Sequence, residues 1–217
     1  AGVMLAGWLC GKITGQNPGI MLDMASCAIP VFMALERVGE DCIEEFNYSR
    51  ALESGFLNGT WLTFSDEYGA NYLATNRLAT IVMLLLFVLL MIDMIRNKRD
   101  GDTCLMFLMV FGACTVILES LRYDRFLSIT FVGLEQVLAA VMLLAGVSVT
   151  AGRYGKNHRG LAIAAVVSVV LAAGIGIGLE FALDRTSINR ILIYAVFIVV
   201  IFTPVALGMK LRDWKEK

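Results

Sequence analysis

The feature that most constrains this 217-residue chain is a succession of long apolar segments. Several of them reach the roughly 18 to 20 residues that a helix needs to cross a hydrocarbon core about 30 Å thick. The chain is 58% hydrophobic and only 17% charged, whereas soluble domains are about 45–50% apolar and about 25% charged. A soluble enzyme fold is therefore excluded. The sequence predicts an all-α, polytopic transmembrane helical bundle with about six to seven spans.

The spans are expected at residues 20–35, 78–95, 103–121, 131–150, 161–183 and 188–209. A shorter apolar run precedes them, begins directly at Ala1 and stops at Gly11, so it resembles half a helix. We therefore expect one integral membrane domain over residues 1–217, with further residues upstream of Ala1.

The segment at 38–72 is polar and aromatic and is too long for an ordinary connection, which favours a folded and functional excursion. The loops between spans alternate in their content of Lys and Arg, and four of these residues lie in the C-terminal tail. Because positive residues favour the cytoplasmic side, the tail is expected in the cytoplasm. Counting back through the spans, segment 38–72 then faces outward.

Charge and cysteine content restrict the partners. The 18 Lys and Arg nearly balance the 19 Asp and Glu, for a net charge of −1, so nucleic acid is not expected as a partner. The five cysteines have no C-x-x-C spacing, and the single histidine, His158, lies in a loop. We therefore expect no metal site and no cofactor.

Polar residues within or beside the spans are costly in lipid and mark candidate sites. Arg37 and Glu40 follow the second apolar run, Glu119 and Arg122 close the run at 103–121, and Gln136 opens the next one. All of them fall on the predicted outward side. Arginine matches the geometry of a phosphate group, so contact with a lipid headgroup is the favoured interpretation.

Structural alternatives remain open for each residue. Glu119 and Arg122 are three residues apart and can form a pair within one helix. Arg37 can be an arginine that extends to the membrane surface, and Gln136 can form a hydrogen bond between helices. In the run at 161–183, the Gly174 and Gly178 spacing predicts a small-residue packing face rather than a phosphate loop.

Short motifs in a fixed order resemble the bacterial prolipoprotein diacylglyceryl transferase family. They are L-A-G-W-L-C-G-K-I-T-G at 5–15, M-L-D-M-A-S-C-A-I-P at 21–30, L-E-R-V-G-E at 35–40, G-A-C-T-V-I-L-E-S-L-R-Y-D at 112–124 and L-E-Q-V-L-A-A at 134–140. The resemblance covers about residues 2–150 and does not extend to the last two spans.

The resemblance implies a multi-pass protein of the bacterial cytoplasmic membrane, with its site at the outer leaflet. The implied reaction transfers a diacylglyceryl group from phosphatidylglycerol to the lipobox cysteine thiol of a prolipoprotein, so membrane lipid and a lipobox peptide are the implied partners. Arg37 and Arg122 would hold the phosphate, Glu119 would orient an arginine or a substrate hydroxyl, and Gln136 would contact substrate. On this basis Arg37 and Glu119 are the catalytic candidates.

The chain also departs from the family pattern. Thr115 stands where the family has an arginine four residues before the Glu, Glu40 replaces an asparagine, and the family's His-Gly-Gly motif would lie upstream of Ala1. A divergent transferase is the leading hypothesis. The alternative is a non-catalytic membrane protein that retains a phospholipid-binding cavity. A small transporter is disfavoured, because the hydropathy shows no inverted duplication.

Overall fold

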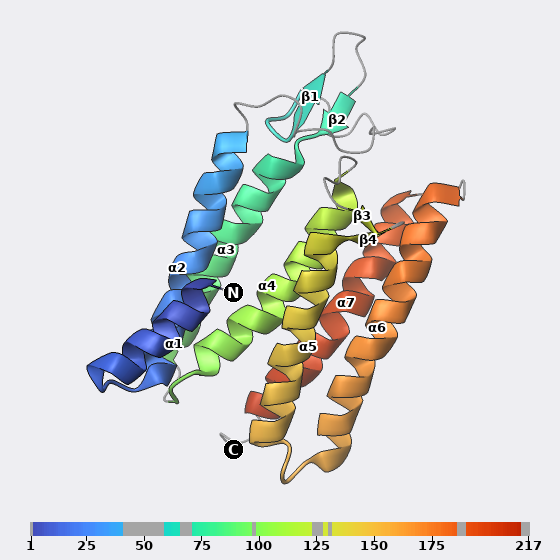
Figure 1. Cartoon of the computed structure of the whole chain (residues 1–217). Helices are drawn as coiled ribbons and strands as arrows, with labels where there is room; N and C mark the ends of the chain where they lie inside the picture. The colour runs from blue at the N-terminus through green and yellow to red at the C-terminus, as the bar shows by residue number, and fades with distance from the viewer. Residues whose placement is uncertain are drawn as a thin grey trace. The chain divides into compact units, whose positions relative to one another are not determined.

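A computed structural model describes residues 2–40, 59–65, 71–96, 99–122, 128–129, 132–185 and 190–213. Its helices are α1 (Gly2–Thr14), α2 (Pro18–Gly39), α3 (Thr75–Arg96), α4 (Asp102–Leu121), α5 (Leu134–Tyr154), α6 (Arg159–Arg185) and α7 (Arg190–Asp213). Two short hairpins pair β1 (Thr63–Ser65) with β2 (Asn71–Leu73), and β3 (Ser128–Ile129) with β4 (Val132–Gly133). In Figure 1 the colour follows the chain from α1 in blue to α7 in red.

Six of these helices, α2 to α7, are long and apolar enough to cross a membrane. The all-α polytopic fold is thus confirmed, and the chain is a multi-pass membrane protein. The helix α1 has 13 residues, about 20 Å at 1.5 Å per residue, which is shorter than a hydrocarbon core. The span predicted from residue 131 begins instead at Leu134, because Val132 and Gly133 pair with β3.

The contacts divide the chain into two compact units, of which the first comprises residues 1–103 and 120–126. Here α1 packs on α2, and α2 packs on α3. The Asn17 side chain caps α2 by accepting a hydrogen bond from the backbone N–H of Gly19. This bond satisfies a donor of the first turn that has no partner within the helix. Asp23 accepts a bond from the Gly101 backbone N–H at 2.7 Å. The turn before α4 is therefore bound to α2.

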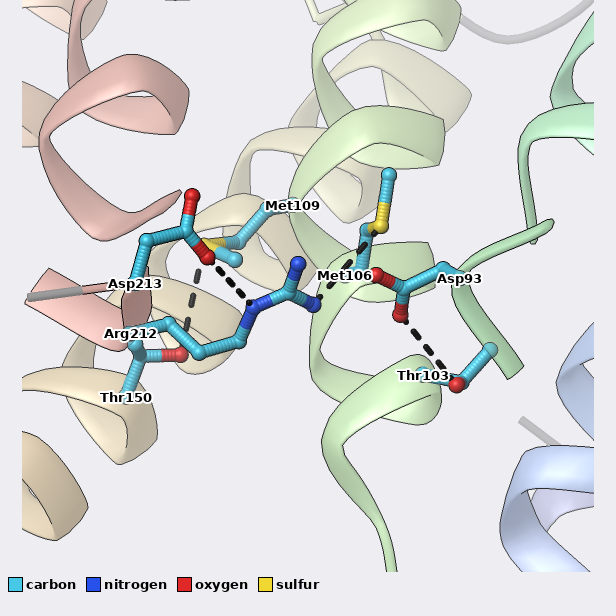
Figure 2. A network of polar contacts seen from close by, with 7 residues as sticks. All are labelled: Asp93, Thr103, Met106, Met109, Thr150, Arg212 and Asp213. Carbon is cyan, nitrogen blue, oxygen red and sulfur yellow. Dashed lines mark hydrogen bonds and ion pairs between the residues drawn. The ribbon is translucent and has the colours of Figure 1, made fainter. Parts of the chain in front are cut away.

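Polar side chains also join α3 to the start of α4. The Thr103 hydroxyl donates to an Asp93 carboxylate oxygen at 3.2 Å, as Figure 2 shows, and both side chains are buried. Buried polar groups are costly unless they are hydrogen-bonded, so the bond helps Asp93 to remain in the last turns of an apolar helix.

Part of the predicted excursion at 38–72 is a folded hairpin. The strands β1 and β2 are antiparallel, with Thr63 opposite Leu73, and the rings of Phe64 and Tyr72 stack at 5.6 Å between centroids. Aromatic cross-strand pairs of this kind stabilise short hairpins. Residues 41–58 and 66–70 lie outside the described part of the chain, and the outward orientation stays a prediction.

The second unit comprises residues 104–119 and 127–217. Its buried core brings together Met109 of α4, Leu143 and Val147 of α5, and Phe197 of α7. The helices α4 and α5 approach closely at Gly112, where an added Cβ would lie 2.7 Å from the Ala139 carbonyl oxygen. Small residues commonly allow such close helix contacts in membranes.

The packing face predicted at Gly174 and Gly178 is wrong for the described chain. A Cβ added at either glycine would meet nothing within 4 Å, whereas one at Gly176 would lie 3.1 Å from the Phe197 ring. The spacing rule selected the face of α6 opposite to the one that packs on α7. Periodicity identifies a stripe of small residues, but the position of the neighbouring helix decides which stripe is used.

Candidate functional site

Arg37 lies in the last turn of α2 and forms an ion pair with Glu40. Its Nη1 is 2.6 Å from Glu40 Oε1, and the two side chains are 13% and 19% exposed. The residues are three apart at the helix end, where Glu40 is the C-cap, so helical geometry places them on one side. The arginine therefore has a carboxylate within the chain at a position suited to a phosphate oxygen.

A second arginine of the first unit was not among the predicted site residues. Arg77 lies in the first turn of α3, where its Nη1 donates to the Trp61 carbonyl oxygen at 2.7 Å and its guanidinium lies 5.5 Å from the Trp61 ring. The end of α2 and the start of α3 lie at the same end of this helix pair in Figure 1. The signal that the sequence offered was a basic residue at the start of a predicted span.

Arg122 is the first residue after α4 and is half-buried. The three-residue spacing from Glu119 predicts a helical residue here, whereas the helix ends at Leu121. Arg37 and Arg122 both belong to the first unit. The proposed role of each in binding phosphate stays a prediction.

Glu119 lies in the last turn of α4, in the second unit, and its side chain is only 7% exposed. One turn earlier, the Thr115 hydroxyl is buried without a hydrogen-bond partner among the described residues. A threonine hydroxyl is short and uncharged, so Thr115 cannot supply the positive charge that an arginine would supply there.

Gln136 connects three helices of the second unit. Its Nε2 donates to Glu180 Oε1 of α6 at 2.9 Å and to the Val116 carbonyl oxygen of α4 at 3.3 Å. The hydrogen bond between helices that the sequence left open is thus confirmed. The Gln136 Oε1 atom is buried and has no partner among the described residues. Because both bonds come from the amide nitrogen, the orientation of the amide group follows from the contacts.

Glu180 is the polar residue that the sequence analysis missed. Its side chain is 2% exposed although it lies inside α6, a predicted membrane span. The available signal was a carboxylate in an otherwise apolar segment, which is costly in lipid and commonly functional. The motifs that resemble the family end before the last two spans, so they do not point to Glu180.

Gln136 and Glu180 both line a cavity of about 340 Å3 between α5 and α6. Every other described residue of the lining is apolar or glycine, including Val137, Ala140 and Ala173. Cavities that bind small molecules typically combine apolar walls with a few polar groups. This geometry suits an apolar ligand with one polar end.

Another group of polar contacts lies at the end of α7. Arg212 lies in the last turn of α7. Its Nε is 3.5 Å from Asp213 Oδ1, and its Nη1 is 3.8 Å from the Met106 sulfur (Figure 2).

Within the described ranges, no group of three or more His, Cys, Asp or Glu side chains is arranged to hold a metal ion.

The chain is similar to one known protein family. A family model described as prolipoprotein diacylglyceryl transferase matches residues 1–151. The chain belongs to this family. Prolipoprotein diacylglyceryl transferase membership indicates, in general terms, a function of that kind and a membrane lipid as a partner. No curated protein and no solved structure matches the chain.

The matched range covers the helices from α1 to most of α5. It therefore includes Arg37, Glu119, Arg122 and Gln136, and it excludes Glu180. The Gln136–Glu180 contact thus joins a residue of the family region to one outside it.

Proposed function

We propose that this protein transfers a diacylglyceryl group from phosphatidylglycerol to the lipobox cysteine thiol of a prolipoprotein. The observation that carries the proposal is the family match over residues 1–151, which contains all the predicted site residues. The proposed location is the bacterial cytoplasmic membrane, with the site at the outer leaflet and the whole chain acting as one membrane domain.

The reaction requires a nucleophile, a leaving group and charge neutralisation. The substrate thiol, after losing its proton, forms a carbon–sulfur bond with the glyceryl carbon, and the bond from that carbon to the phosphate oxygen breaks. Glycerol phosphate leaves with the electron pair, and the thiol proton passes to its phosphate oxygen or to solvent. Arg37 and Arg122 would bind the phosphate, and guanidinium groups that meet developing negative charge lower such barriers by several kcal/mol, about 3 for a single donor.

Two buried residues of the second unit, Glu119 and Gln136, are the other proposed site residues. Glu119 would orient an arginine or a substrate hydroxyl, and Gln136 would offer its unpartnered amide oxygen to a hydroxyl of the substrate. Buried side chains lose little entropy on binding, which supports a positioning function. The thiol belongs to the substrate, so the cysteines of the chain need no chemical role.

A second function is favoured by one contact. Arg37 is paired with Glu40 at 2.6 Å, and a phosphate beside Arg37 would meet this carboxylate. Together with Thr115, this contact supports a protein that binds phospholipid without catalysing transfer.

A transfer assay separates the two functions. Full-length protein in liposomes would receive phosphatidylglycerol labelled in its acyl chains and a lipobox peptide, beside an Arg37→Ala variant. Transfer of label to the peptide that disappears in the variant supports the transferase. Intact phosphatidylglycerol binding without transfer would reject it in favour of the lipid-binding function.

A further inference from the structure

The cavity between α5 and α6 has one polar end. Gln136 is the third residue of α5, and Glu180 lies in the last two turns of α6, so the antiparallel helices bring them to one end. From there the lining extends along α5 to Leu144 and along α6 to Val169. At 1.5 Å per residue these stretches measure about 12 and 16 Å. The cavity is thus an elongated apolar groove with one polar end.

The size of the cavity is sufficient for an acyl chain. Its volume is about 340 Å3, whereas an engineered apolar cavity of about 150 Å3 already binds benzene. Val141, Val170 and Ile177 line it and are more than half exposed. A lipid chain can therefore enter sideways from the bilayer.

The polar end requires a ligand that donates hydrogen bonds. Gln136 uses its amide nitrogen on Glu180 and Val116, which leaves an amide oxygen, buried and unpartnered, at this end. Glu180 adds a second acceptor. A buried acceptor without a donor is unfavourable, so a ligand hydroxyl would supply the missing bond.

Charge then distinguishes between classes of lipid. Among the described lining residues Glu180 is acidic and none is Lys or Arg. A phosphate group would meet a carboxyl group and an amide oxygen, with no Lys or Arg in the described lining to neutralise it. A neutral hydroxyl avoids this penalty.

We infer that this cavity binds an acyl chain of a neutral lipid whose head carries a free hydroxyl, as in a diacylglycerol or a monoacylglycerol. The hydroxyl donates to Gln136 Oε1 or to Glu180. This lipid site shares Gln136 with the proposed transfer site, but it goes beyond the transfer reaction, because it needs neither Arg37 nor Arg122 and no bond is formed or broken.

Photolabelling tests the lipid class directly. Full-length protein in nanodiscs would be labelled with a diacylglycerol that carries a diazirine in one acyl chain, and the modified peptides would be mapped by mass spectrometry. Unlabelled diacylglycerol or monoacylglycerol should reduce the labelling of α5 and α6. The stronger competitor is the neutral lipid that the cavity prefers. The 3-O-methyl ether of the diacylglycerol and phosphatidic acid with the same acyl chains should compete at least about tenfold more weakly.

Two alanines of α6 provide a matched pair of variants. Ala173 lines the cavity, whereas Ala164 is also exposed on the same helix and does not line it. Ala173→Phe should abolish the labelling, and Ala164→Phe should preserve it. Glu180→Leu should reduce the difference between diacylglycerol and phosphatidic acid, because the repulsive carboxylate is gone.

Three results would overturn the inference: no labelling of α5 or α6, equal labelling of the two phenylalanine variants, or phosphatidic acid competing as well as diacylglycerol. The wild-type competition needs no variant, so a folding defect cannot obscure it. Failure here leaves the transfer assay unaffected, since that assay measures label on the peptide and uses Arg37→Ala.

Discussion

Replacing Glu40 should strengthen the binding of phosphatidylglycerol to Arg37. In the structure, the Glu40 carboxylate lies 2.6 Å from the guanidinium, in a half-buried setting. A lipid phosphate must displace this carboxylate or lie beside it, and either arrangement is unfavourable. Glu40→Gln removes the negative charge and preserves the size of the side chain.

The magnitude follows from the contact. A hydrogen bond to a charged group contributes about 1.5–3 kcal/mol net, so its loss on lipid binding weakens affinity by about 10- to 150-fold. Glu40→Gln should therefore lower the dissociation constant for phosphatidylglycerol by a factor of this size. The lower limit is the safer expectation, because both side chains retain some exposure and solvent screens the pair.

Titration of fluorescent phosphatidylglycerol into phosphatidylcholine nanodiscs that contain the protein measures this gain. Glu36→Gln is the matched control, since Glu36 is exposed on the same helix and loses the same charge. Adding Arg37→Ala to Glu40→Gln should cancel the gain. Unchanged affinity in Glu40→Gln, or an equal gain in Glu36→Gln, would refute the assignment of Arg37 to the phosphate.

Three further predictions concern binding, packing and orientation. Arg122→Ala should remove measurable phosphatidylglycerol binding in the same titration, because the proposed phosphate site needs its guanidinium; unchanged affinity would contradict this role. Gly112→Leu should lower the melting temperature in detergent, since its Cβ would lie 2.7 Å from a backbone oxygen and overpacking costs about 1–3 kcal/mol. Gly174→Leu, with nothing near its Cβ, should leave that temperature unchanged, and equal losses would refute the packing argument. In a cysteine-free background, Thr60→Cys should react with a membrane-impermeant maleimide added from outside, and Lys156→Cys should not. The reverse pattern would show that the predicted topology is wrong.

Much of the fold was predictable because lipid imposes a simple rule. A backbone in hydrocarbon must satisfy its own hydrogen bonds, so each long apolar run becomes a helix. The ends of the helices were less predictable, as α5 shows: Val132 is apolar and was assigned to a span, yet it pairs with Ile129 in a hairpin. Hydropathy measures the preference for lipid and contains no information on strand pairing.

Some contacts of the predicted site residues were also predictable from the sequence, and others were not. The proximity of Arg37 and Glu40 is local, because three residues at a helix end determine it. The contact of Gln136 with Glu180 joins residues 44 positions apart. No spacing rule relates such residues, because their distance depends on how α5 and α6 pack.

By itself, the sequence determined that this is a helical membrane protein and which polar residues lie near the ends of its spans. The motifs also indicated the family that the comparison then showed. Only the tertiary structure decided that Gln136 contacts Glu180 at one end of an apolar cavity, and that Gly112 rather than Gly174 lies at a helix contact. The physical reason is that transfer into lipid depends on each segment separately, whereas a cavity and a close helix contact depend on which faces of different helices meet.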